Sequence, residues 1–265
     1  MLITRALVGA IGAILALIVV YTGGLALLIA LIVLSVLGLH EFYRMTRSYK
    51  PNLLAGYAGA ILILIGAHTG GLEGALRGTI YLFALTFILH AIRGLKPEMV
   101  GEMAVTYFGA FYVGVGFSHV ILLRNTPAFG VSLAFVVLLA TWSSDTVAYT
   151  VGHFLGQRPI SPVISPKKTI EGTLAGFVGT IVVVLIVGKQ LGWMGSGQFF
   201  VLGLVIAIAA PLGDLFESYI KRASHVKDAG TIIPGHGGIL DRFDSLLFAS
   251  VASFYIVAAL VSSGS

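Results

Sequence analysis

The sequence predicts an all-α, polytopic integral membrane protein. Hydrophobic residues make up 57% of the 265 residues and charged residues only 10%, where a soluble domain has about 25% charged residues. The mean hydropathy is +1.00. Apolar stretches of roughly 16–22 residues recur along the chain, each long enough to cross a hydrocarbon core of about 30 Å. Because these runs are continuous and do not alternate as in a membrane barrel, the spans are predicted to be helices.

About nine such spans are predicted, separated by short polar breaks. They lie near residues 6–22, 24–40, 53–69, 78–92, 103–123, 129–150, 171–190, 199–222 and 244–262. The first span follows Arg5 as a secretory signal would, but it ends without an A-x-A site, so we expect it to be retained. The seventh span is predicted to begin at Ser165-Pro166, because serine caps helices and proline favours the first helical position. Pro211 in the eighth span frees a carbonyl one turn earlier, which favours a kink beside a polar cavity.

The distribution of basic residues predicts the orientation. With the gaps between spans numbered alternately, one side of the membrane holds Arg77, Arg124 and Lys189, and the side of the N-terminus holds the other 13 of the 16 basic residues. Basic residues favour the cytoplasmic side. We therefore expect a cytoplasmic N-terminus, an external C-terminus and a multi-pass location in the cell (inner or plasma) membrane.

Composition also excludes several kinds of function. The chain has no cysteine, which excludes disulfides, thiolate metal sites and a cysteine nucleophile. Its formal net charge is +5, but there is no long basic run interleaved with aromatic residues, so nucleic acid is not expected as a partner. The 34 glycines are interpreted first as residues that let helices pack closely.

Ionisable residues gather in the second half of the chain, and an ionisable residue inside a span indicates a functional site. Helical spacing places five polar side chains along one face of the eighth span: Asp214, Glu217, Ser218, Lys221 and Arg222. Asp145 lies near the end of the sixth span. We therefore expect residues 129–265 to form the catalytic region, and residues 1–128 to form supporting, lipid-facing helices that could also make dimer contacts.

Two loops have the composition of phosphate sites. The loop between residues 223 and 244 combines Lys227, Gly237-Gly238 and Asp241-Arg242, so that backbone amides and basic groups could bind phosphate while carboxylates hold Mg²⁺. The segment Ser165-Pro-Lys-Lys-Thr-Ile-Glu-Gly172 places Lys167 and Lys168 at a helix start, which favours anions. Each feature alone is also compatible with a simple interhelical turn or a topology anchor.

Residues 218–244 resemble the signature of phosphatidate cytidylyltransferases, also called CDP-diacylglycerol synthases. The match runs through Ser218, Lys221-Arg222, Lys227-Asp228 and the stretch from His236 to Asp244. The segment at 165–172 is similar to a second segment of that family, and Asp145 and Asp214 fit its acidic positions. These motifs cover roughly the second half of the chain.

The resemblance implies that CTP and phosphatidate give CDP-diacylglycerol and pyrophosphate in phospholipid biosynthesis, with Mg²⁺ as cofactor and room for a second cation. It implies a site on the cytoplasmic side, where CTP is found, and partners limited to CTP, phosphatidate, membrane lipid and, as the sequence allows, a second copy. The expected catalytic residues are Asp214, Asp241, Lys221 and Lys227. The expected metal ligands are Asp214, Asp241, Asp244 and Asp145. The expected substrate-binding residues are Lys167, Lys168, Ser218, Arg222, His236, Gly237, Gly238 and Arg242.

Three alternatives remain open at the level of sequence. A CTP-dependent polyprenol kinase would need a base for its hydroxyl substrate and would release CDP. A cation-coupled transporter would use Asp214 and Glu217 as ion sites, but such proteins commonly show matched broken helices in two halves. An intramembrane aspartyl protease is suggested by Pro211-Leu-Gly-Asp214, which departs from Gly-x-Gly-Asp and leaves the basic loop unexplained.

Overall fold

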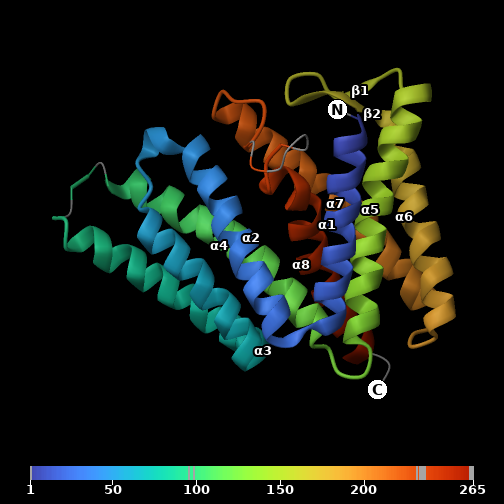
Figure 1. The fold of residues 1–265 in the computed structure, drawn as a ribbon, viewed down its shortest axis with the longest axis horizontal. Coiled ribbons are helices and arrows are strands. Elements are labelled where there is room, and N and C mark those ends of the chain that lie inside the picture. The colour runs from blue at the N-terminus through green and yellow to red at the C-terminus, as the bar shows by residue number, and fades with distance from the viewer. Residues whose placement is uncertain (1, 95, 98, 231, 233–236, 263–265) are drawn as a thin grey trace. The chain divides into compact units, whose positions relative to one another are not determined.

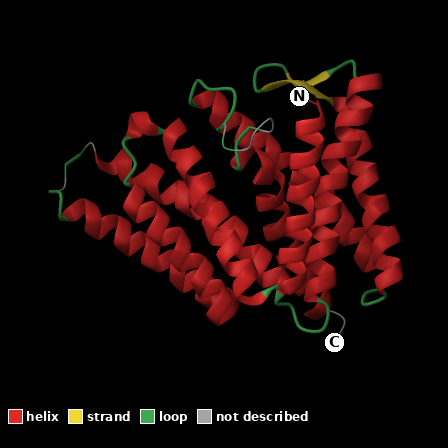
Figure 2. Ribbon diagram, in the orientation of Figure 1, coloured by secondary structure: helices red, strands yellow, loops and turns green. Residues whose placement is uncertain are grey.

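The computed structural model describes residues 2–94, 96–97, 99–230, 232 and 237–262, with the backbone alone for residues 2–6. The described residues form eight α-helices, one 3-10 helix and one antiparallel hairpin (Figure 1). Helices dominate the chain (Figure 2), so the predicted all-α class is confirmed. The elements are α1 (Leu2–Thr22), α2 (Gly24–Met45), η1 (Arg47–Tyr49), α3 (Leu53–Ala91), α4 (Met99–Arg124), α5 (Gly130–Leu155), β1 (Pro159–Ser161), β2 (Ser165–Thr169), α6 (Ile170–Leu191), α7 (Ser196–Ala223) and α8 (Leu240–Ser262).

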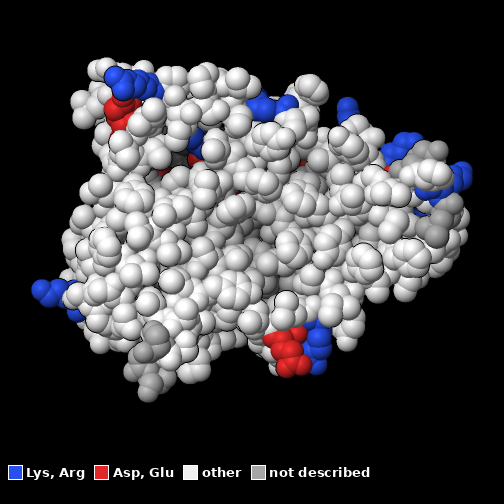
Figure 3. All heavy atoms as spheres, turned by 180° about the vertical axis from the view of Figure 1, so that it is seen from behind, with Lys and Arg blue, Asp and Glu red and all other residues white. Residues whose placement is uncertain are grey.

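Among the described residues, seven helices, α2 to α8, are long and apolar enough to cross a membrane, and α1 contributes the shorter apolar segment Leu7–Thr22. Large apolar side chains lie exposed on them, for example Leu25 at 67% and Phe83 at 62%. One face of the molecule shows almost only uncharged residues (Figure 3). Such a surface suits lipid as the solvent, so the polytopic membrane character is confirmed. The number of spans and the orientation stay predictions.

Helix α3 contains a break where two spans are predicted. Gly70 and Gly71 have non-helical backbone angles, and Gly71 has φ 59°, which glycine adopts at least cost. The two limbs run back along each other (Figure 1). An added Cβ at Gly66 would overlap the main chain of Gly74, and one at Gly59 would overlap Leu82. The break therefore separates the predicted spans 53–69 and 78–92.

The chain forms two compact units. The first comprises residues 1–122 and 223–243, and the second comprises residues 123–222 and 244–265. The boundary near residue 122 lies close to the predicted division at 128, but the first unit also takes up the loop that precedes α8. The assignment of catalysis to residues 129–265 stays a prediction.

In the first unit, polar side chains join the ends of α2, α3 and α4. The Tyr43 hydroxyl donates to the main-chain oxygen of Thr106 at 2.6 Å, and the Asn52 amide donates to the Thr106 hydroxyl at 2.8 Å. Asn52 also caps α3 by accepting from the Ala55 amide at 3.1 Å. These bonds fix the connection between α2 and α3 against α4.

In the second unit, small residues let helices approach closely. Gly172 and Gly176 of α6 face α5, where an added Cβ would meet the main-chain oxygens of Ala148 and Ser144 at 2.5 and 2.8 Å. An added Cβ at Gly213 of α7 would overlap the main-chain oxygen of Asp244 in α8. Close contacts through small residues are typical of membrane helices. Here they let α7, which carries Asp214, pack closely against α8, which carries Asp244.

The seventh span begins close to the predicted residue 171, but the helix start expected at Ser165-Pro166 lies about one turn too early. Residues 165–169 form β2, which pairs antiparallel with β1, and α6 begins only at Ile170. Thr169 is the N-cap, and its hydroxyl accepts from the Gly172 amide at 3.2 Å. The hairpin keeps Pro166 in extended backbone, so the pattern of serine followed by proline does not open the helix.

Candidate active site

A cluster of carboxylates and ammonium groups lies in the second unit. Asp214 of α7 pairs with Lys168 of β2, and each side chain is about one third exposed. One turn further along α7, Glu217 pairs with Lys221, and the Glu217 side chain is fully buried. A buried carboxylate is costly unless a charge compensates it, so these pairs explain why acidic side chains persist on this helix face.

Asp244 is the most enclosed aspartate of this cluster. It is 6% exposed, and its Oδ1 accepts from the Ser245 amide at 2.6 Å. The charges of Asp145, Asp214 and Glu217 act on its carboxylate. The Ser245 hydroxyl also lies 3.5 Å from Oδ1 of Asp145. Four carboxylates from α5, α7 and α8 therefore gather in this unit.

The donors of the cluster suit a hard divalent cation, which prefers oxygen ligands. The cluster consists of four carboxyl groups and two ammonium groups. In the described part of the chain, however, no three acidic or histidine side chains lie close enough together to hold one metal ion. The Asp214 carboxylate instead forms an ion pair with the Lys168 ammonium group. The residue types fit a divalent cation, while the assignment of individual metal ligands stays a prediction.

The hairpin supplies basic residues beside the end of α7. The Arg222 Nε donates to the main-chain oxygen of Ile164 at 3.1 Å, which ties α7 to the turn of the hairpin. Lys167 is exposed and Lys168 is half-buried. Ser218 is buried, at 8% exposure. The predicted anion-binding segment and the predicted polar stripe of α7 therefore lie side by side.

The loop before α8 is organised by two acidic residues of the first unit. Oδ2 of Asp241 accepts from the amides of Ala229 and Gly238 at 3.1 and 2.9 Å. The buried Glu41 of α2 accepts from the amides of Ile239 and Leu240, at 3.1 and 2.9 Å, through its two carboxylate oxygens. Glu41 therefore caps the first turn of α8, where the helix dipole favours an anion.

Glycines of this loop make room for these carboxylates. An added Cβ at Gly230 or Gly238 would overlap the carboxylate of Glu41. Gly237 has φ 88°, a conformation that favours glycine. The amide of Gly238, predicted to meet substrate, donates to Asp241 here. At least part of the glycine pattern thus serves the internal structure of the loop.

The predicted site residues fall in both compact units. Asp145, Lys168, Asp214, Ser218, Lys221, Arg222 and Asp244 lie in the second unit, and Lys227, Gly237, Gly238, Asp241 and Arg242 lie in the first. Lys227 and Arg242 are exposed. His236 lies outside the described residues.

Sequence reasoning assigned no site role to Glu41 or Ser245, and it gave Glu217 a role only as an ion site in the transporter alternative. A signal existed for both glutamates, because each is an acidic residue within an apolar helix. The partners of Glu41 lie 198 and 199 residues away along the chain, so no spacing rule could connect them. Ser245 carries no such signal.

Comparison with known proteins decides the family. The sequence pattern of the cytidylyltransferase family matches residues 3–260. The chain belongs to this family. A cytidylyltransferase from Bacillus subtilis (strain 168), named phosphatidate cytidylyltransferase, is 34% identical over 264 residues, which cover 96% of this chain and 97% of that protein. A protein of the same name from Staphylococcus saprophyticus is 36% identical over 170 residues, or 63% of this chain and 64% of that protein.

The resemblance to phosphatidate cytidylyltransferases is therefore confirmed. The match extends through the first half of the chain, where the sequence alone shows only generic spans. Membership in the cytidylyltransferase family makes this chain a membrane nucleotidyltransferase, and it does not favour the transporter and protease alternatives.

Proposed function

We propose that this chain condenses CTP with phosphatidate to give CDP-diacylglycerol and pyrophosphate, with Mg²⁺, at the cytoplasmic side of the cell membrane. The observation that carries the proposal is the cluster of Asp145, Asp214, Glu217 and Asp244 with Lys168 and Lys221, in a chain whose relatives are named phosphatidate cytidylyltransferases. A site of this kind suits substrates that are themselves polyanions.

In the proposed reaction, an oxygen of the phosphatidate phosphate attacks the α-phosphorus of CTP. One P–O bond forms to that oxygen, the bond between the α-phosphorus and the bridging oxygen breaks, and pyrophosphate leaves with the electron pair. A phosphate monoester is largely ionised near neutral pH because its second pKa is about 6. The nucleophile therefore needs no general base, and the site needs mainly to position and neutralise the two anions.

Basic residues of the second unit are suited to that neutralisation. Lys168 and Lys221 each pair with a carboxylate in this structure. Arg222 follows Lys221 in α7, and its Nε donates to the main-chain oxygen of Ile164, in the turn of the hairpin that carries Lys168. In the substrate complex, Lys168 would exchange Asp214 for a phosphate of CTP or of the lipid. Its ion pair would thus keep the ammonium group in place before substrate arrives.

The carboxyl groups of the second unit are suited to a divalent cation, for which Asp214, Asp244 and Asp145 would supply ligands. For Asp241, in the first unit, the role of metal ligand stays a prediction from the sequence. When bound, the cation would screen the phosphate charges and polarise the α-phosphoryl group. Release of Lys168 from Asp214 would free a carboxylate oxygen for this purpose. Glu217 is buried against Lys221 and would orient that lysine.

A turnover measurement with two labels tests the proposal. The purified chain in mixed micelles receives phosphatidate and CTP labelled separately at the α- and γ-phosphates, with Mg²⁺ or with chelator. We expect the α label in lipid and the γ label in pyrophosphate, only when Mg²⁺ is present. Transfer of the γ label to a polyprenol would instead support the kinase. Inertness toward both lipids would reject a cytidylyltransferase and a kinase alike.

A further inference from the structure

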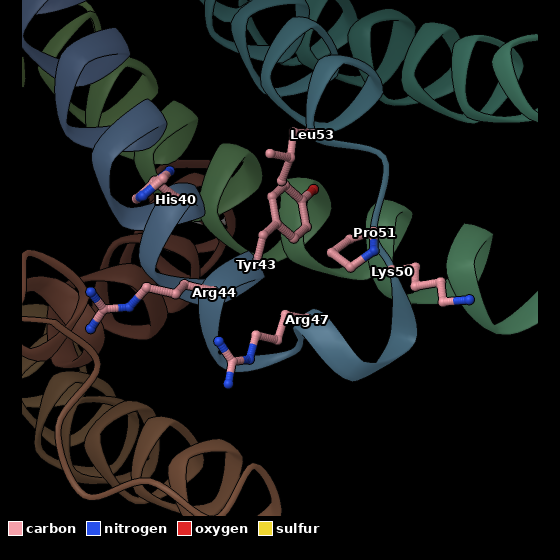
Figure 4. A pocket seen from close by; sticks show the side chains of 7 residues that line it. All are labelled: His40, Tyr43, Arg44, Arg47, Lys50, Pro51 and Leu53. Carbon is pink, nitrogen blue, oxygen red and sulfur yellow. The ribbon is translucent and has the colours of Figure 1, made fainter.

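The connection between α2 and α3, in the first unit, forms an open pocket that the proposed reaction does not use. The pocket has a volume of about 280 Å³. Its lining consists of His40, Tyr43, Arg44, Arg47, Lys50, Pro51 and Leu53 (Figure 4). A stretch of 14 residues thus supplies three permanent cations and an apolar wall. The volume is close to the lower end of the range for small-ligand sites.

The cations of this pocket form no ion pair with a carboxylate of the described residues, although the charge of Arg44 acts on the buried Glu41. No carboxylate of the described residues lies within 4.0 Å of the side-chain nitrogens of Arg44, Arg47 or Lys50. The nearby carboxylate of Glu41 is buried and accepts from the backbone of α8. Arg44 and Arg47 extend on the same side of the connection, whereas Lys50 extends on the other (Figure 4). Two planar guanidinium groups on one side form the arrangement that binds phosphate oxygens best.

Backbone features add to this preference for an anion. Leu53 is the first residue of α3 and lines the pocket, so the positive end of the α3 dipole borders it. Lys50 has φ 51°, in the left-handed region where glycine would be relaxed. The chain thus carries a lysine at a position that costs backbone energy, directly beside the pocket.

The location of the pocket points to lipid as the source of the anion. α2 and α3 are both long and apolar enough to cross a membrane, and the pocket lies in the short connection between them. Phosphate headgroups lie at that level of a bilayer, and clustered basic residues beside a span attract anionic lipids. Leu53 and Leu54 are 45% and 67% exposed beside it, as contacts with acyl chains require.

We propose that this pocket binds the phosphate headgroup of an anionic phospholipid, with Arg44 and Arg47 as the phosphate ligands. Tyr43, Pro51 and Leu53 form the wall beside the glycerol backbone. The site holds a lipid that the enzyme does not need to consume. It therefore does not depend on the proposed function, and its occupancy is measured without CTP.

Native mass spectrometry on the full chain in phosphatidylcholine nanodiscs tests the proposal. The probe is dioleoyl phosphatidylglycerol, an anionic lipid with a phosphodiester headgroup, titrated into the unmodified chain and three variants. Arg44→Gln with Arg47→Gln removes the two ligands, and Arg44→Lys with Arg47→Lys keeps their charge. Arg93→Gln with Lys96→Gln removes two basic residues that do not line the pocket.

The unmodified chain and the Arg93/Lys96 variant should bind one phosphatidylglycerol with equal affinity. The Arg44/Arg47 glutamine pair should bind it about 25-fold more weakly, as expected for two basic residues at a membrane surface. The lysine pair should bind with intermediate affinity, because it keeps the charge but loses the planar guanidinium groups. Equal affinity for all variants would overturn the proposal, as would an equal loss in the Arg93/Lys96 control. Displacement of the lipid by millimolar inorganic phosphate would also overturn it, because the site would then take a free anion.

Discussion

Removal of the Glu41 carboxylate should loosen the loop that precedes α8. Glu41 is 1% exposed and accepts two backbone amides of the first turn of α8. A hydrogen bond to a charged group contributes about 1.5–3 kcal/mol, so Glu41→Ala should lower the local stability of this turn by about 3–6 kcal/mol. Glu41→Gln keeps the shape and one acceptor oxygen, and it should cost about half as much.

Hydrogen–deuterium exchange of the amides of Ile239 and Leu240 measures this effect directly. Since 1.4 kcal/mol is a factor of ten, exchange should accelerate about 100-fold or more in Glu41→Ala and roughly tenfold or more in Glu41→Gln. Turnover should fall in the same order, because Asp241 and the glycines of the loop depend on this turn.

The matched control is Glu73→Gln. Glu73 also lies in the first half of the chain, but its side chain is 82% exposed and its contact with Arg77 spans 4.0 Å. An exposed pair of this kind contributes little, so exchange and turnover should stay unchanged. If exchange at Ile239 and Leu240 in Glu41→Ala matched that of the control, the capping role of Glu41 would be refuted.

Two further predictions concern the second unit. Lys168→Gln should raise the KM for CTP about tenfold, because a phosphate-binding cation is lost, and it should lower the Mg²⁺ concentration for half-maximal activity, because it frees Asp214. The control Lys189→Gln changes an exposed residue near the other end of α6 and should alter neither value. Unchanged values in Lys168→Gln would remove Lys168 from the site. Gly213→Ala should lower the free energy of unfolding by about 1–3 kcal/mol, because the added Cβ would overlap the main chain of Asp244. In the control Gly197→Ala, in the same helix, the added Cβ meets no atom within 4 Å and the change should be neutral. Equal melting temperatures for the two variants would contradict this packing.

The membrane helices could be predicted from the sequence because lipid imposes long apolar runs whose ends are marked by polar residues. The predicted spans 129–150 and 171–190 correspond closely to α5 (Gly130–Leu155) and α6 (Ile170–Leu191). The break inside α3 was also predictable as a gap between two spans, since Gly70-Gly71 interrupts the apolar run.

Features that depend on distant partners could not be predicted in this way. The hairpin of β1 and β2 was missed because three- and five-residue strands carry little pattern, and a helix-start interpretation of Ser165-Pro166 competed with it. The pairing of Lys168 with Asp214 joins two predicted site residues, but only the fold brings them together. The contact of Glu41 with α8 spans most of the chain, and periodicity carries no information about it.

The most direct test of the account concerns Asp244, which lies among the charges of three other carboxylates in the second unit. Asp244→Asn replaces the carboxyl group with an amide at nearly constant shape, and Glu73→Gln is again the control. Transfer of the α label of CTP to phosphatidate should fall roughly 100-fold or more in Asp244→Asn, as expected when a charge-stabilising group is lost, while the variant still inserts and the control keeps full activity. Transfer within twofold of the unmodified chain in Asp244→Asn would contradict the claim that this cluster is where the reaction takes place.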